Sequence, residues 1–169
     1  MEWPNDEQIA VWHASLFRTA LRMTGRAEDA ADLTQLAFSK ALNAWDQFEA
    51  HAKPIAWLYR ILINCVRDWH RKRAATSPQR LSEGTIVAAD PPETAVEKAI
   101  RREQLECLRR EIRGLPGGIR EAFIITVLDG YSYEEAAELL AVPVGTIGSR
   151  VYQARRRLRE AMRKSFPEA

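Results

Sequence analysis

The chain contains few of the residues that build metal, redox or catalytic centres. Only two cysteines and three histidines occur among its 169 residues. Cys65 and Cys107 lie in segments of helical pattern and have no paired metal-ligand spacing, so we expect buried free thiols. No glycine loop suited to phosphate and no nucleophile in a recognisable turn is present. The sequence therefore predicts a protein that is not an enzyme and needs no metal or cofactor.

Long apolar runs are also missing. No run reaches the roughly 18 apolar residues that a transmembrane helix needs, and the N-terminus lacks the basic and then apolar pattern of a secretory signal. We therefore expect a cytoplasmic protein without membrane insertion. No strand-like alternation appears anywhere, whereas apolar residues recur with the helical period, which predicts an all-α fold.

Net charge is small, but the charges are unevenly placed. The chain carries 25 Lys and Arg against 23 Asp and Glu, a net charge of +2. Residues 1–50 hold eight acids and four bases, a net of −4, whereas residues 60–73 hold five bases and one acid, a net of +4. Residues 145–164 hold seven bases and one acid, a net of +6. An acidic N-terminal part and two basic segments indicate a protein partner at one surface and nucleic acid at two others.

Apolar spacing predicts helices over residues 6–24, 27–45 and 54–73, and again over 95–114 and 119–128. Gly25 is the expected C-terminal cap of the first, and residues 115–118 read as a turn. Residues 74–94 contain three prolines and one glycine and have no usable period, which is typical of a linker. We expect two small helical domains, 1–73 and 95–169, joined by a flexible linker over 74–94.

Residues 132–158 read as a helix-turn-helix. Ser132 and Glu135 form the pattern of a capping box, and Pro143 breaks the first helix and suits the start of the next. The second helix has an apolar stripe at Ile147, Val151, Ala154 and Leu158. Its opposite side is polar and basic, with Thr146, Ser149, Arg150, Gln153, Arg156 and Arg157. A solvated amphipathic helix in a bundle is the alternative; the proline turn favours a helix that enters a DNA major groove.

Two blocks of sequence carry a family resemblance. The first is AEDAADLTQLAFSKALNAW followed by KPIAWLYRILINCVRDWHRKR (27–45 and 53–73), and the second is LPGGIREAFIITVLDGYSYEEAAELLAVPVGTIGSRVYQARRRL (115–158). In this order, with a proline-rich segment between them, they resemble bacterial RNA polymerase sigma factors of the extracytoplasmic-function group. The resemblance covers nearly the whole chain. Because the sequence ends about eleven residues past Leu158, we expect no additional C-terminal domain.

The resemblance implies three binding surfaces and an anti-sigma factor as a regulatory partner. The N-terminal domain would bind the β′ clamp helices of core RNA polymerase, and the C-terminal domain would sit on the β flap. The polymerase-binding residues implied are Asp29, Asp32, Gln35, Leu36 and Phe38. Those implied for the promoter −10 element are Phe48, His51, Lys53, Asn64, Arg67, Arg71 and Arg73. Those implied for the −35 element are Thr146, Ser149, Arg150, Tyr152, Gln153, Arg156 and Arg157.

Two positions depart from the family pattern. Leu36 stands where glutamate is usual, and it is either an exposed part of the polymerase contact or a residue packed on the first helix. Gly148 stands where many members have a basic residue, which predicts a different −35 preference because a possible base or phosphate contact is missing. For Trp57 and Trp69 we favour core packing over stacking on single-stranded DNA.

Two other functions remain as alternatives. A two-component-type regulator could end in a similar helix-turn-helix, but the absent α/β receiver pattern and the N-terminal block argue against it. A sigma-like decoy would bind an anti-sigma factor without binding DNA. Such a decoy needs no basic recognition face, and this sequence has one.

Overall fold

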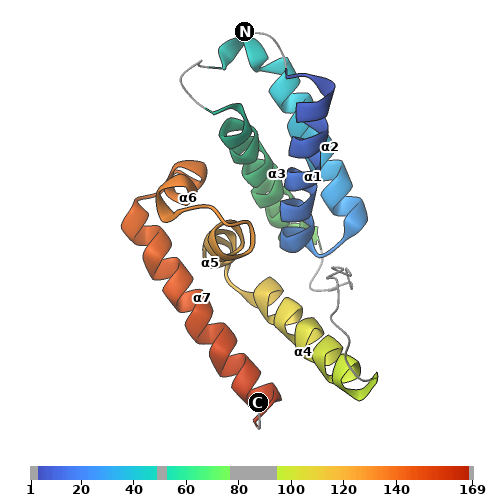
Figure 1. Cartoon of the computed structure of the whole chain (residues 1–169). Helices are drawn as coiled ribbons and strands as arrows, with labels where there is room; N and C mark the ends of the chain where they lie inside the picture. The colour runs from blue at the N-terminus through green and yellow to red at the C-terminus, as the bar shows by residue number, and fades with distance from the viewer. Residues whose placement is uncertain (1–3, 49–52, 77–94, 168–169) are drawn as a thin grey trace.

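The computed structural model describes residues 4–48, 53–76 and 95–167. Over these residues all regular secondary structure is helical, which confirms the all-α prediction (Figure 1). The N-terminal group is α1 (Asp6–Thr24), α2 (Ala27–Asn43) and α3 (Pro54–Thr76). The C-terminal group is α4 (Ala95–Gly114), α5 (Gly117–Phe123), α6 (Tyr133–Leu140) and α7 (Val144–Ser165). A 3-10 turn (Trp45–Gln47) follows α2, and a π-helical turn (Ile124–Leu128) follows α5.

The predicted linker and the described helices overlap slightly. Residues 74–76 continue α3, so this helix extends one turn beyond the predicted end at residue 73. Residues 77–94 lie outside the described residues. The division into two helical groups is confirmed, and the domain limits 1–73 and 95–169 stay predictions.

Local sequence explains both ends of α1. The Asn5 side chain accepts a hydrogen bond from the Gln8 backbone N–H (2.9 Å), and the Gln8 side chain accepts one from the Asn5 N–H (3.3 Å), which is a complete capping box. At the other end Gly25 adopts a left-handed conformation (φ 75°), and its N–H donates to the Leu21 carbonyl. A residue with a Cβ atom would be strained there. The predicted cap at Gly25 is therefore confirmed.

The N-terminal core lies between α1, α2 and α3. Alanines 30, 37 and 41 of α2 are buried, and their small side chains let the helices approach closely. Leu16 of α1 and Leu62 of α3 are fully buried in the same cluster. Burying a leucine side chain contributes roughly 2 kcal/mol. The alternation of small and large residues thus fixes the orientation of α3, the helix that carries the predicted −10 residues.

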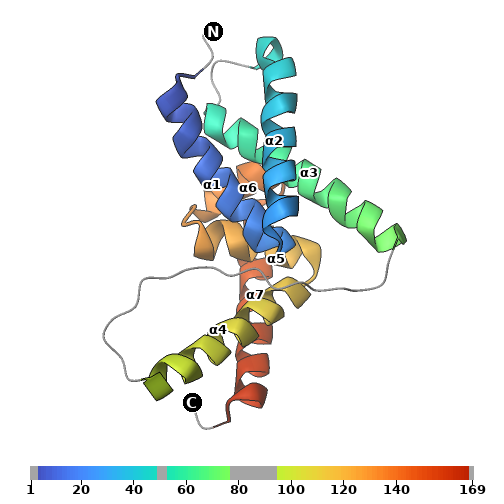
Figure 2. The ribbon, with the colours of Figure 1, turned by 90° about the vertical axis from the view of Figure 1, so that its right-hand side faces the viewer.

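The C-terminal group is built around α7, which packs against α4, α5 and α6. In Figure 2, α4 crosses α7. The predicted apolar stripe of Ile147, Val151, Ala154 and Leu158 is buried along this contact. The helix continues seven residues beyond the expected end at 158, to Ser165.

The helix expected over residues 119–128 is corrected by the structure. It begins two residues earlier, as α5, and its last part is the wider π-helical turn. The Asp129 N–H bonds to the Ile124 carbonyl (2.9 Å), and the Tyr131 N–H bonds to the Ile125 carbonyl (3.1 Å). Apolar spacing carries no signal for such a bulge, because a π turn inserts one residue into an otherwise α-helical pattern.

The two helical groups are in direct contact. Helix α1 touches the π-helical turn and α4, and α3 touches α6. In Figure 1 the N-terminal helices lie above the C-terminal ones and meet them near α5 and α6. The contact brings residues of α3 against residues of α5, which matters for the site described next.

Candidate nucleic-acid and polymerase interfaces

The helix-turn-helix begins with the predicted capping box. Ser132 Oγ accepts from the Glu135 N–H (3.1 Å), and Glu135 Oε2 accepts from the Ser132 N–H (3.0 Å). Helix α6 ends at Ala141, which has a left-handed conformation (φ 53°), and Pro143 precedes the first residue of α7. A non-glycine residue in this conformation is unfavourable. Packing of α6 and α7 therefore holds the turn, and with it the direction of α7.

The exposed side of α7 carries most of the predicted −35 residues. In Figure 1, α7 forms one border of the molecule. Tyr152 is 67% exposed. The other side chains that are exposed on this side are Ser149, Gln153, Arg156 and Arg157. Hydroxyl, amide and guanidinium groups on one exposed helix side suit both base edges and phosphates.

Thr146 and Arg150, the other two predicted −35 residues, are half-buried. The Thr146 carbonyl accepts a hydrogen bond from Ser149 Oγ (3.0 Å). The Arg150 guanidinium lies over the start of α5, where a Cβ atom at Gly118 would be 3.0 Å from Arg150 Cζ. Because Gly118 has no side chain, the space beside it is open to the Arg150 guanidinium. Sequence reasoning assigned Gly118 only to a turn.

Gly148 faces Tyr133 of α6. A Cβ atom at position 148 would lie 3.8 Å from the Tyr133 ring, which is ordinary van der Waals distance. Position 148 therefore lies at the junction of α6 and α7. The predicted effect of Gly148 on −35 preference stays a prediction.

Among the predicted −10 residues, Asn64, Arg71 and Lys53 are exposed. Arg71 forms an ion pair with Asp68. Lys53 Nζ lies 3.8 Å from Glu135 Oε1 on α6. His51 lies outside the described residues.

Phe48, Trp45 and Trp57 form an aromatic cluster beside the start of α3. The Phe48 ring stacks on Trp45 (5.1 Å between centroids) and packs against Trp57 (5.2 Å). Phe48 is buried. In this structure its ring packs against Trp57 of α3, and contact of its ring with a promoter base stays a prediction.

The remaining two predicted −10 residues are engaged within the chain. Arg67 Nε and Nη2 donate to the two carboxylate oxygens of Glu121 on α5, at 2.9 and 2.7 Å. This bond raises the pKa of the Arg67 guanidinium. The Arg73 guanidinium lies 5.1 Å above the Trp69 ring and 3.6 Å from Asp29. The predicted core packing of Trp57 and Trp69 is confirmed, because both half-buried rings pack on the hydrophobic core.

The predicted polymerase-binding residues lie along α2. Asp32 and Gln35 are exposed, and Leu36 is 44% exposed, which favours an exposed contact residue over one packed on α1. Phe38 is half-buried beside the His13 ring (5.7 Å). Asp29 is paired with Arg26 (3.3 Å) as well as with Arg73. The exposed members of the predicted set on α2 are therefore one leucine, one carboxylate and one amide.

Several buried polar groups were not found by sequence reasoning. Asp129 accepts hydrogen bonds from Thr19 (2.7 Å) and from Arg22 of α1, and burial raises the pKa of its carboxyl group. Arg120 Nη2 lies 2.8 Å from His70 Nε2, and burial together with the Arg120 charge lowers the pKa of His70 to about 4. No periodic pattern marks these residues, because their partners lie on the other domain.

Other kinds of site find no support in the part of the chain that the structure describes. Cys65 and Cys107 are buried free thiols, as predicted, and burial raises the pKa of Cys65. Within residues 4–48, 53–76 and 95–167 no cluster of side chains could hold a metal ion. Over the same residues no helix combines the length and apolarity that crossing a membrane requires.

Two helical domains, of which the second presents an exposed basic recognition helix, define a helix-turn-helix protein of the DNA-binding class. Comparison with family models makes this class specific. Residues 9–76 match the model of Sigma-70 region 2, and residues 105–158 match that of Sigma-70, region 4.

Proteins of similar sequence are sigma factors as well, in agreement with both family-model matches. The RNA polymerase sigma-H factor of Pseudomonas aeruginosa is 30% identical over 158 residues, which cover 88% of this chain and 81% of that protein. The ECF RNA polymerase sigma factor EcfG of Rhodopseudomonas palustris is 34% identical over 145 residues, which cover 85% and 77%. The chain belongs to the extracytoplasmic-function sigma factors of the sigma-70 family, which are regulatory transcription factors and not enzymes.

Solved structures with the same fold include two that were determined as complexes with another protein. The sigma factor RpoE in complex with the anti-sigma factor NepR, from Bartonella quintana, aligns with a TM-score of 0.73 at 28% identity, covering 93% of this chain and 95% of that one. CnrH in complex with the cytosolic domain of CnrY aligns with a TM-score of 0.66 at 25% identity, covering 91% and 84%.

Proposed function

We propose that this chain binds core RNA polymerase in the cytoplasm and directs initiation at promoters that carry a matching −35 and −10 element. The single observation that carries the proposal is the exposed cationic side of α7, in a chain whose other domain matches Sigma-70 region 2. A basic helix side of this kind is typical of phosphate neutralisation with release of counterions.

The −35 element is bound by the helix-turn-helix. Ser149, Gln153 and Arg150 lie toward the N-terminal end of α7, the part of a recognition helix that contacts base edges. Arg156 and Arg157 lie one turn further on and bind phosphates. In this arrangement the first group sets sequence preference, and the second sets affinity and its dependence on salt.

The −10 element is bound by α3 and the segment before it. Asn64 and Arg71 are exposed for contact with the melted non-template strand. Holding a base outside the stack offsets an unstacking penalty of a few kcal/mol. The protein makes or breaks no covalent bond, since it selects the site at which the polymerase opens DNA.

Polymerase aligns the two domains. A scaffold that fixes the spacing of the two domains on the promoter raises the effective concentration of one DNA-binding domain at its element once the other is bound. The exposed side of α2, with Asp32, Gln35 and Leu36, contacts the β′ clamp helices, and the C-terminal domain contacts the β flap. The similar sigma factor RpoE, solved in complex with the anti-sigma factor NepR, supports an anti-sigma factor as the regulator of this chain as well.

Transcription by reconstituted holoenzyme tests the proposal. Core polymerase with the purified chain is incubated with genomic DNA, and the transcripts are sequenced to map their start points. We expect a set of starts that share upstream elements and that disappear with Arg156→Ala/Arg157→Ala. Arg102→Ala is the matched control, because Arg102 is an exposed arginine of the same domain on α4.

The sigma-like decoy gives the opposite result. A decoy binds an anti-sigma factor but yields no promoter-specific transcript with core polymerase. The exposed basic side of α7 disfavours it, because a protein that never binds DNA has no use for that surface. Absence of any defined start point, with polymerase that is active with another sigma factor, would overturn the proposal.

A further inference from the structure

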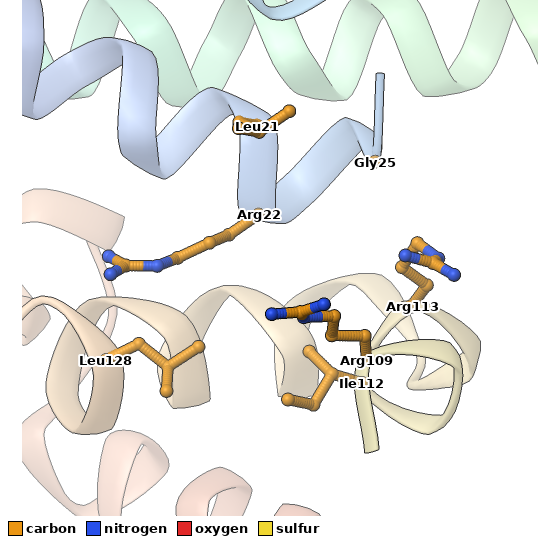
Figure 3. Close-up of a pocket in the computed structure, with 7 residues that line it drawn as sticks. All are labelled: Leu21, Arg22, Gly25, Arg109, Ile112, Arg113 and Leu128. Atoms are coloured by element: carbon orange, nitrogen blue, oxygen red, sulfur yellow. The ribbon is translucent and has the colours of Figure 1, made fainter. Parts of the chain in front are cut away.

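An open cleft of about 340 Å³ lies between the end of α1 and the end of α4, and residues of both domains line it (Figure 3). The described residues that line it are Leu21, Arg22 and Gly25 of α1, Arg109, Ile112 and Arg113 of α4, and Leu128 of the π-helical turn. The three α4 residues face the cleft together because positions three and four apart share one side of a helix. Gly25, the C-cap of α1, has no side chain to fill the space.

One part of this cleft is apolar. Ile112 is buried and Leu21 half-buried, and both pack with the hydrophobic core. Leu128 is 36% exposed, so part of its side chain is in contact with water. An apolar group placed against this part of the cleft would leave water together with the leucine surface that it covers, which is favourable.

The other part of the cleft is cationic. The Arg22 side chain extends away from Arg109 and Arg113 (Figure 3), and Arg22 forms an ion pair with Asp129. Arg109 and Arg113 lie four positions apart on α4, so their side chains are neighbours. Both also interact with other groups of the chain, but the described residues that line the cleft include no acid. The α4 side of the cleft therefore brings two positive charges together.

A third cation lies next to this pair. Arg120 Nη1 donates to the Arg113 carbonyl (2.7 Å), and Arg120 Nη2 lies 2.8 Å from His70 Nε2. Neither of these partners is an anion. Burial lowers the pKa of Arg120, and the charge of Glu121 only partly opposes this. The surroundings of Arg113 therefore have a positive potential, which attracts an anion.

We propose that this cleft binds a small organic anion that has an apolar body. The carboxylate or phosphate group of this ligand bonds to the guanidinium groups of Arg109 and Arg113, which bind both kinds of oxyanion. Its apolar body covers Leu21, Ile112 and Leu128. A mainly apolar wall with a few convergent polar groups is typical of sites for small molecules. The proposal is independent of promoter binding, because it involves neither α3 nor the exposed side of α7.

Such a ligand would contact both domains at once. Leu21 belongs to the N-terminal domain, whereas Arg109 and Arg113 belong to the C-terminal domain. A ligand that needs residues of both binds the associated domains more tightly than the separated ones, and it stabilises the folded chain as its concentration rises. The midpoint of thermal unfolding should therefore increase with ligand concentration.

Binding of four probes to the full-length chain tests the proposal. Octanoate and phenyl phosphate join an apolar body to a carboxylate and to a phosphate, inorganic phosphate lacks the apolar body, and octanol lacks the charge. Calorimetry measures the affinities, and amide chemical shifts in nuclear magnetic resonance locate the site. We expect octanoate or phenyl phosphate to bind about tenfold more tightly than inorganic phosphate and octanol, because only they use both parts of the cleft. The tighter of the two shows whether the natural ligand is a carboxylate or a phosphate. Shift changes should gather at residues 21–25 and 109–113.

Two variants separate the cationic part of the cleft from the apolar part. Arg109→Gln/Arg113→Gln should weaken binding of the tighter probe about tenfold, because charged hydrogen bonds are lost. Arg155→Gln/Arg159→Gln removes two exposed arginines of α7 and is the matched control for net charge; it should leave the affinity unchanged. Leu128→Gln keeps every charge and changes a partly exposed side chain. It should weaken binding of octanoate and phenyl phosphate but not of inorganic phosphate.

Three results would overturn the proposal. The first is an equal affinity for phenyl phosphate, octanoate and inorganic phosphate, which would indicate a cationic surface without an apolar site. The second is an unchanged affinity in Arg109→Gln/Arg113→Gln whose helical circular dichroism matches the parent. The third is a set of shift changes that lies away from the cleft. Failure of promoter-specific transcription concerns only the proposed function, because none of these measurements uses DNA or polymerase.

Discussion

The basic sides of α3 and α7 differ in what they touch. Helix α7 turns Arg156 and Arg157 to solvent. Helix α3 has its Arg67 bound to Glu121 and its Arg73 beside Asp29 and Trp69. The surface predicted to bind the −35 duplex is thus exposed, whereas part of the surface predicted to bind the −10 single strand is engaged within the chain.

The largest expected effect is on α7, the helix whose arginines are exposed. Arg156→Ala/Arg157→Ala removes two phosphate contacts, so we expect affinity for a −35 duplex to fall about 100-fold at low salt. The slope of log affinity against log salt should fall in magnitude by about 2. Fluorescence anisotropy at several salt concentrations measures both. An unchanged slope would show that these arginines face away from the DNA.

Gly118 tests whether α7 depends on its support from α5. In Gly118→Ala the new methyl group displaces the Arg150 guanidinium, which lies 3.0 Å from that position. We expect duplex affinity to fall about fivefold, on the order of one lost base contact, with little change in melting temperature because the displaced atoms end a flexible side chain. Gly117→Ala is the matched control, since nothing lies within 4 Å of its added methyl group. Equal effects of the two variants would contradict a role for Arg150.

A pH titration tests α3, the helix whose Arg67 and Arg73 are engaged within the chain. With the domains in contact, burial and Arg120 of α5 lower the pKa of His70 to about 4, with Arg73 adding to the effect and a hydrogen bond to the Met23 backbone on α1 opposing it. After the domains separate, the pKa returns toward 6.5. The open form therefore binds a proton more tightly, and acidification from about pH 6.5 to about pH 4 favours separation of the domains. Burial raises the pKa of Asp129 while the domains are in contact, so protonation of this carboxyl group opposes the effect of His70.

Nuclear magnetic resonance of the His70 ring measures this directly. We expect a low pKa in the parent and one near 6.5 in Glu121→Gln/Asp129→Asn, which removes two carboxylates of the domain contact. Small-angle scattering should show expansion of the parent on acidification, and His70→Gln should reduce it. An identical His70 titration in the parent and in the double variant would contradict the link between this ring and the domain contact.

The smallest expected effect concerns Gly148. Glycine inside a helix is less favourable than alanine by about 0.5–1 kcal/mol, and the added methyl group would lie at van der Waals distance from Tyr133. Gly148→Ala should therefore raise the free energy of unfolding by up to that amount, measured by urea denaturation. Gly148→Arg should in addition change the −35 base preference. A Gly148→Arg variant with the parent's preference and affinity would show that this position does not contact DNA.

Local pattern predicted the helices well, because each of their signals is local. The capping box at Ser132 and the cap at Gly25 form as expected, and so does the buried stripe from Ile147 to Leu158. The π-helical turn at Ile124–Leu128 was missed, because an inserted residue leaves no trace in a short apolar segment.

The candidate site likewise has one part that local sequence predicts and another that only the fold reveals. Exposure of Gln153 and Arg157 follows from their place opposite the apolar stripe of one helix. Pairing of Arg67 with Glu121 joins residues 54 positions apart, and Arg22 with Asp129 joins residues 107 apart. Helical periodicity relates only residues within one helix, so neither pair could be predicted from it. For Phe48, likewise, burial depends on tertiary packing of its ring against Trp45 and Trp57.

The most direct test of the account compares two ligands on one preparation of the free chain and of its complex with core polymerase. One ligand is a −35 duplex and the other a −10 non-template single strand, both taken from promoters mapped with the holoenzyme. We predict that the free chain binds the duplex but binds the single strand weakly, and that polymerase strengthens single-strand binding. Equal single-strand affinity for the free chain and the polymerase complex would contradict the account.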